Sequence, residues 1–243
     1  MRLAVSILAT LVGLLPQSAL NAPFPAADTF SGPLAGRSAL IHQRLTDANL
    51  WRDHVMVVAH RAGWKENGVP VRAENSFAAI DHAVEQGVEM VEMDVRRSRD
   101  GVLVVMHDAT LERTTTCRGA VEDLSLAALR TCRLVVEGQR QLTDETVFTL
   151  EEAMRHAKGR ILINIDNKLE PEALVEVAEL AQRLEMTDGL LLKMAVWNAE
   201  RLQLARDIRR AIGPEIAFMP ILADDAVKEA DFIDRTEASL SAP

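Results

Sequence analysis

The fold is decided by residues 55–108, which open with the apolar run Val55-Met56-Val57-Val58-Ala59 and then change abruptly to His60-Arg61. Two further apolar runs follow, one carrying Glu92-Met93-Asp94 and one closing with Val104-Val105-Met106-His107-Asp108. Short runs rich in β-branched residues are typical of buried parallel strands. Because each run contains or ends in groups that bind metals or move protons, the stretch predicts an active site at the mouth of a βα-barrel.

Strands and helices are expected to alternate on both sides of this stretch, which indicates parallel strands joined by right-handed crossovers. Besides Val55–Ala59, the expected strands are Val88–Val95, Val102–Met106, Arg160–Asp166, Leu190–Val196 and Ile216–Leu222. The expected helices are Ser38–Trp51, Ser76–Gln86, a capped helix starting at Thr149, Pro171–Leu184, Ala199–Ile212 and Asp224–Asp234. The pattern predicts an α/β, TIM-type (βα) barrel that is incomplete at its C-terminus, with about six of the eight units.

The composition excludes several classes of function. The chain has 243 residues, 48% hydrophobic and 26% charged, which is ordinary for a globular protein. A net charge of -9 and an aromatic content of 4% argue against nucleic-acid binding. They leave a phosphate-bearing small molecule open, because a bound metal ion can reverse the local charge.

The N-terminus reads as an export signal. Arg2 precedes a short apolar run that ends at Pro16, which is the pattern of a signal peptide and too short for a membrane span. We therefore expect a signal peptide at residues 1–22, a linker and short helix at 23–52, and a barrel domain at 53–243. The protein is expected to be periplasmic or secreted, without a stable membrane anchor. A retained N-terminal helix is the alternative.

Two cysteines, Cys117 and Cys132, are the only ones in the chain. In an oxidising compartment they could form a disulfide, which for this loop length contributes about 3 kcal/mol. Two reduced, unrelated cysteines are an equally good reading of the spacing.

Acidic side chains in the apolar runs suggest a metal site. Glu92 and Asp94 are two positions apart on a strand and therefore project to the same face. Asp166 ends a later strand and could add a third carboxylate, which would make an oxygen-rich site suited to Mg²⁺ or Ca²⁺. Lys168 would point the same way, and it and Arg61 are candidate contacts for a phosphate group.

Two histidines end the first and third runs, and His60 and His107 could act as general base and general acid. Together with a hard metal ion and two cations, they describe the cleavage of a phosphodiester. Each of these residues also has a purely structural interpretation. Each histidine could be a hydrogen-bonded core residue, and Asp166 and Lys168 could form a local ion pair in a turn. Glu74-Asn75 could start a helix.

The order of these motifs resembles the glycerophosphodiester phosphodiesterase family, within the phospholipase-C-like phosphodiesterases. The similar motifs are His60-Arg61, Glu74-Asn75, Glu92-Met93-Asp94, Asp100-Gly101, His107-Asp108, Leu111-Glu112-Arg113-Thr114-Thr115, Phe148-Thr149-Leu150-Glu151-Glu152 and Asn164-Ile165-Asp166-Asn167-Lys168. The resemblance covers residues 55–222. Ala62 stands where the family usually has glycine, and Asp166 stands where it usually has glutamate.

The resemblance implies a TIM barrel with a divalent metal, Mg²⁺ or Ca²⁺. Its metal ligands would be Glu92, Asp94 and Asp166, with Glu74 nearby. The acid/base pair would be His60 and His107, and the phosphate contacts Arg61 and Lys168. The implied reaction releases an alcohol and glycerol 3-phosphate.

Two alternatives stay open beside this reaction. One is a noncatalytic module that binds metal and phosphate. The other is a phosphodiesterase acting on another lipid diester. The expected partner is a small-molecule substrate, and an oligomer is possible.

Overall fold

The computed structural model describes residues 36–47, 53–138 and 141–222, together with Phe232, Thr236 and Leu240. The chain divides into two compact units, Met1–Ser31 and Gly32–Pro243, and all described residues belong to the second. The expected signal peptide lies outside the described residues. So does the expected helix Asp224–Asp234, except for Phe232.

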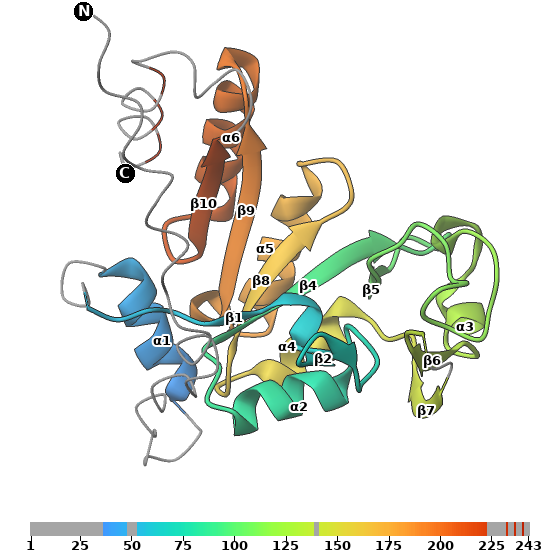
Figure 1. Ribbon diagram of the computed structural model, residues 1–243. Coiled ribbons are helices and arrows are strands. Elements are labelled where there is room, and N and C mark those ends of the chain that lie inside the picture. The colour runs from blue at the N-terminus through green and yellow to red at the C-terminus, as the bar shows by residue number, and fades with distance from the viewer. Residues whose placement is uncertain are drawn as a thin grey trace, which may run out of the picture. The chain divides into compact units, whose positions relative to one another are not determined.

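A curled, mainly parallel sheet forms the centre of the unit (Figure 1). Its parallel strands, in spatial order, are β1 (Val58–Ala59), β4 (Met90–Arg97), β8 (Leu162–Asn167), β9 (Leu190–Val196) and β10 (Ala217–Leu222). This confirms the predicted α/β barrel class. One expected unit is corrected: β5 (Leu103–Val105) pairs antiparallel with β4. The turn at Asp100-Gly101 is too short for the crossover that a parallel partner needs.

The two faces of the sheet differ in chemistry. On β4, Val91, Met93 and Val95 point outward and join the main hydrophobic core. The alternate residues Glu92 and Asp94 therefore point inward. The inner face is thus free for polar chemistry, while the outer face anchors the strands.

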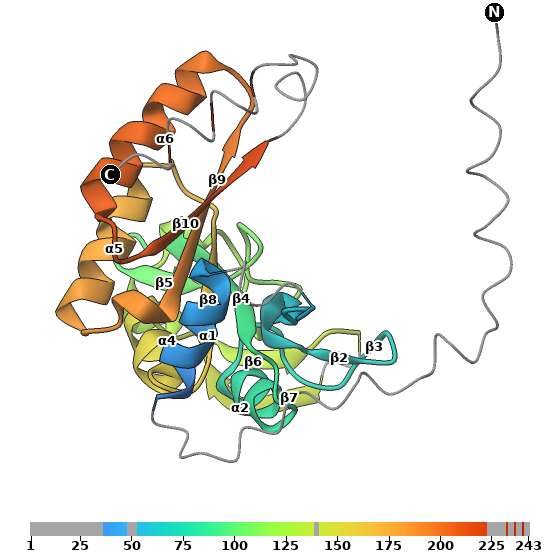
Figure 2. The ribbon, with the colours of Figure 1, turned by 90° about the vertical axis from the view of Figure 1, so that its left-hand side faces the viewer.

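Helices cover the outer face, and Figure 2 shows α5 and α6 side by side along β9 and β10. They are α2 (Phe77–Glu85), α4 (Leu150–Ala157), α5 (Ala173–Arg183) and α6 (Ala199–Ile212). The predicted N-cap of α4 is confirmed, because Thr149 and Glu152 form a reciprocal capping box. The apolar sides of these helices meet the outward residues of the strands in one core.

Helix α1 (Arg37–Thr46) packs against the amino ends of β4, β8 and β9. Its Ile41 forms a second, smaller core with Met90, Leu162 and Leu191, which begin or nearly begin their strands and point inward. The buried Arg37 donates hydrogen bonds to carbonyl oxygens of Gly87, Val88 and Arg160. The short helix predicted at Ser38–Trp51 is thus present as α1, which packs at the amino end of the inner face.

The connections between the first strands carry further small elements. They are the hairpins β2 (Lys65–Glu66) with β3 (Val69–Pro70) and β6 (Arg133–Val136) with β7 (Gln141–Thr146), helix α3 (Leu126–Leu129), and short 3-10 turns at His60–Ala62 and Val121–Asp123. A third 3-10 turn, Thr187–Gly189, precedes β9. Cys117 and Cys132 form a disulfide in this region, with Cα atoms 5.3 Å apart. Within the described residues, no helix is both long and apolar enough to cross a membrane.

Candidate active site

Three carboxylates meet on the inner face where β4 and β8 end. Glu92, Asp94 and Asp166 each offer an oxygen within 4.8 Å of the others. The strand register explains this, because Asp94 on β4 is paired with Asp166 on β8. In adjacent strands, paired residues project to the same face. The set predicted from sequence is therefore brought together.

Burial and mutual repulsion make this cluster ready for a cation. Asp94 is completely buried, and Asn75 donates a hydrogen bond to its Oδ2 over 2.9 Å. Its Oδ1 lies 3.0 Å from the Nζ of Lys168, in an ion pair. Burial raises the pKa of Glu92, with a further contribution from the neighbouring charge of Asp94. Three carboxylates that converge, two of them buried, fit a hard divalent ion.

Two lysines reach the cluster from different strands. Lys168, just after β8, places its Nζ 2.6 Å from Asp166 Oδ2 and 3.0 Å from Asp94 Oδ1. Burial disfavours its charge, but the hydrogen bonds to Asp166 and Asp94 outweigh this and raise its pKa. Lys193 on β9 lies 3.7 Å from Asp166 Oδ1. Lys168 was predicted here, whereas Lys193 was not.

The loop after β1 folds over the carboxylates through Arg61. The Arg61 backbone N–H donates to Glu92 Oε2 over 2.8 Å. Its guanidinium donates to Glu74 Oε2 over 2.9 Å and to His107 Nε2 over 2.8 Å. Arg61 and Ala62 both have left-handed backbones, with φ of 50° and 64°. Ala62 therefore occupies a conformation that favours glycine, and its methyl group is buried in the core.

His107 is held in one tautomer by its two neighbours. Arg61 can only donate, so His107 Nε2 accepts, and Nδ1 carries the proton that it donates to Asp108 Oδ1 over 2.7 Å. Asp108 is in turn bonded to Arg113, whose hydrogen bond is the largest cause that lowers the Asp108 pKa to about 2. The result is an oriented imidazole whose Nε2 accepts a hydrogen bond from Arg61 at the border of the site.

His60 is placed differently. Its side chain is 68% exposed, and its Nε2 lies 4.0 Å from Glu92 Oε2. The two predicted histidines thus both border the carboxylate cluster, one through Glu92 and one through Arg61. His107 is fixed by hydrogen bonds, while His60 faces solvent.

The structure does not place Glu74 in the carboxylate cluster. Its oxygens are engaged by Arg61 and by Arg113, which lies 2.7 Å from Oε1. Burial opposes the charge of Glu74, but hydrogen bonds from Arg113 and Arg61 outweigh it and lower the pKa. Glu74 therefore lies outside the cluster and is paired with two arginines, and its place beside a metal ion stays a prediction.

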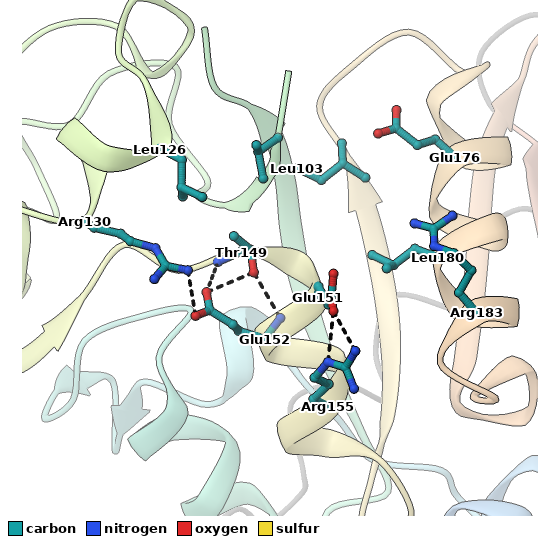
Figure 3. A pocket seen from close by; sticks show the side chains of 11 residues that line it. Leu103, Leu126, Arg130, Thr149, Glu151, Glu152, Arg155, Glu176, Leu180 and Arg183 are labelled. Atoms are coloured by element: carbon teal, nitrogen blue, oxygen red, sulfur yellow. Dashed lines mark hydrogen bonds and ion pairs between the residues drawn. The ribbon is translucent and has the colours of Figure 1, made fainter. Parts of the chain in front are cut away.

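A pocket of about 450 Å³ lies elsewhere, between β5, α3, α4 and α5 (Figure 3). None of the predicted site residues lines it. Figure 3 shows two ion pairs among the residues that line it, Arg130 with Glu152 and Arg155 with Glu151. The pocket is a gap between surface elements and not the place where the carboxylates meet.

Comparison with known proteins identifies the family. Residues 47–238 match the model of the glycerophosphoryl diester phosphodiesterase family. The chain belongs to this family. Lysophospholipase D GDPD1 of Rattus norvegicus is 34% identical over 187 residues, which are 74% of this chain and 52% of that protein.

Solved structures of family members share the fold. The glycerophosphoryl diester phosphodiesterase of Parabacteroides distasonis superposes with a TM-score of 0.60 at 25% identity, covering 74% of this chain and 58% of that one. A phosphodiesterase of Oleispira antarctica, solved with the product sn-glycerol-3-phosphate, gives 0.53 at 26% identity, covering 77% and 73%. This chain thus spans little more than half the length of the rat and Parabacteroides relatives.

Proposed function

We propose that this chain hydrolyses glycerophosphodiesters to an alcohol and glycerol 3-phosphate with the help of a divalent metal ion. The observation that carries the proposal is the meeting of three carboxylates with an oriented histidine at one end of the sheet. Family membership supports the same reaction, and the Oleispira relative is recorded with glycerol 3-phosphate as product.

In this proposal Glu92, Asp94 and Asp166 hold Mg²⁺ or Ca²⁺. The bound ion would supply positive charge against the phosphoryl oxygens and would polarise the phosphorus centre. Asn75 keeps Asp94 oriented through its 2.9 Å hydrogen bond. Such outer contacts fix the direction of a ligand's lone pairs.

His107 is the proposed general base. Its Nε2 lone pair would take the proton of the substrate's glycerol hydroxyl as that oxygen attacks phosphorus, and Asp108 would stabilise the imidazolium through Nδ1. Departure of the alcohol would leave a cyclic phosphate, which water would then open to glycerol 3-phosphate. Asp108 can do so because Arg113 keeps it ionised. His60, which is open to solvent beside Glu92, is the proposed acid that protonates the leaving alkoxide.

Arg61 is the proposed phosphate clamp, with Lys168 beside it. The guanidinium of Arg61 currently bonds to His107 Nε2. A phosphate that draws this guanidinium away would leave the Nε2 lone pair free for the proton transfer. Binding of the substrate would thereby prepare the base.

The test is release of glycerol 3-phosphate from glycerophosphocholine by the purified full chain with Mg²⁺, with Ca²⁺ and with chelator. We expect turnover that chelator removes and that His60→Ala lowers strongly. Metal binding without any turnover would instead favour a noncatalytic module. Because the rat relative is named a lysophospholipase D, lysophosphatidylcholine is the second substrate to compare.

Export remains a proposal for this chain. The signal-like residues 1–22 support it, and so does the Cys117–Cys132 disulfide, because such bonds persist in oxidising compartments. Fractionation of producing cells would test it. Full-length protein found only in the cytoplasm, with both thiols free, would contradict it.

A further inference from the structure

Strand β9 places at the carboxylate cluster a lysine, Lys193, that has no role in the proposed mechanism. Lys193 lies in the apolar run Leu190–Val196, where its outward neighbours Leu192 and Met194 join the main core. Alternation therefore turns Lys193 to the inner face. Ile165 on β8 is paired with Leu192 on β9, so the residues that follow them, Asp166 and Lys193, lie side by side on the two strands.

The ammonium of Lys193 has donors to spare. Its side chain is only 17% exposed, and its one ion pair in the described structure is the 3.7 Å contact with Asp166 Oδ1. That separation exceeds a hydrogen bond. Lys168, by contrast, lies within 2.6 Å and 3.0 Å of its two carboxylates. The N–H donors of Lys193 are therefore available for a ligand at the cluster.

The charge balance of the site indicates that the ligand of Lys193 is an anion. A divalent ion and Lys168 together balance the three carboxylates. A phosphodiester then brings one additional negative charge, and its cleavage product carries more. Lys193 is the inward cation on β9 that can offset it, and an ammonium binds phosphoryl oxygens as a point charge.

We propose that Lys193 binds a non-bridging oxygen of the substrate's phosphoryl group, opposite Arg61. This inference rests on the proposed function for the identity of the substrate. It adds β9 to the strands that contact the substrate. Lys193 would then affect substrate and product binding more than metal binding.

The test measures binding of glycerol 3-phosphate to the Mg²⁺-loaded full chain by calorimetry. For Lys193→Met we expect the Kd to rise about tenfold, the loss of one charge-assisted hydrogen bond. Lys193→Arg should recover most of the affinity. Lys158→Met is the matched control, because Lys158 bonds to the Leu184 carbonyl away from the cluster, and it should bind like the unmodified chain.

Metal titration of the same variants separates phosphate binding from a purely structural role. Removing a cation beside Asp166 should leave Mg²⁺ affinity unchanged or higher. If Lys193→Met instead weakens Mg²⁺ binding, Lys193 serves to position Asp166 and the proposal is overturned. A Kd for glycerol 3-phosphate within twofold of the unmodified chain would also overturn it.

Two safeguards keep the result interpretable. Circular dichroism checks folding, and Lys193→Gln provides a second neutral variant if Lys193→Met does not fold. Turnover of glycerophosphocholine by the unmodified chain tests the proposed function separately. With turnover present, Lys193→Met should raise KM more than it lowers kcat. If the unmodified chain shows no turnover, the Kd for glycerol 3-phosphate still tests the role of Lys193. If the unmodified chain does not bind glycerol 3-phosphate, the proposal is overturned.

Discussion

The inner face of the sheet has two unlike halves. On β4 and β8 it carries Glu92, Asp94 and Asp166, and Asp94 is completely buried. On β10 the same face carries Met219 and Ile221, which are 40% and 39% exposed. Charges are buried and apolar groups are open to solvent, which inverts the usual distribution in soluble proteins.

This contrast shows that the groups suited to catalysis are concentrated on β4 and β8. Burying carboxylates is unfavourable unless they are compensated. The compensation comes from Lys168, Lys193, Asn75 and the Arg61 backbone, which belong to separate segments. The β10 half makes no comparable network among the residues the structure describes.

The largest effect is expected at His107. Replacing His107 with alanine removes the oriented lone pair, and turnover should fall about 10²–10⁴-fold, the usual contribution of a general base. Mg²⁺ affinity should change little, because His107 is not one of the clustered ligands. His82→Ala on α2 is the control and should retain full activity. Steady-state kinetics with glycerophosphocholine gives the answer. Retention of most of the activity by His107→Ala would remove this histidine from the proposed mechanism.

A smaller effect is expected at Asn75, which orients Asp94 without touching the substrate. Asn75→Ala deletes the 2.9 Å hydrogen bond to Asp94, and Mg²⁺ affinity should fall about 10–100-fold, as for other outer contacts of ligands. Asn198→Ala is the matched control. Asn198 caps α6, so its loss should cost about 1 kcal/mol of stability and leave metal binding intact. Equal metal affinities in both variants would show that Asp94 needs no support.

The Asp108–Arg113 pair should make stability depend on pH. The Asp108 pKa is lowered from 3.8 to about 2 in the folded state, chiefly by the hydrogen bond from Arg113. The stabilisation is therefore present above pH 4 and is lost as the pH falls toward 2. At pH 7, Asp108→Asn should cost about 1–2 kcal/mol after allowance for solvent screening.

Urea unfolding of both chains between pH 2 and 7 measures this loss. The two curves of unfolding free energy should converge at the acid end. Curves that stay parallel would show that this ion pair does not stabilise the fold.

The smallest effect is expected on β10. Met219→Gln should change the free energy of unfolding by less than about 0.5 kcal/mol, as for other exposed positions. Met90→Gln, on the same face but 1% exposed, should cost about 2–3 kcal/mol. Thermal unfolding compares the two. A large loss from Met219→Gln would mean that this half of the face is covered in solution, and the contrast between the halves would disappear.

The sequence predicted the charged half well because its signals are local. Glu92 and Asp94 stand two apart in an apolar run, so strand periodicity alone places them on one face. The same argument applies to Lys193, a lone charge in the run Leu190–Val196, and it could have identified that residue. Here the signal was present but was not used.

Other features could not be read locally. The short turn at Asp100-Gly101 already requires an antiparallel pairing, but the edge of β4 that β5 joins depends on β1 and β8, which come from elsewhere in the sequence. Whether Glu74 meets a metal or an arginine depends on Arg113, which lies 39 residues further along the chain. When a residue type is compatible with several roles, tertiary contacts of this kind decide which role it has.

The contacts of Arg61 also constrain how the protein is made. Arg61 reaches residues 13, 31 and 46 positions further along, through Glu74, Glu92 and His107. On a ribosome, which releases the chain from its N-terminus, the loop after β1 has no complete set of partners until His107 has emerged. The first strand is thus synthesised early and its loop is ordered late. Until β4 has emerged, Val57 and Val58, which are partly exposed even in the folded chain, have no strand to pair with.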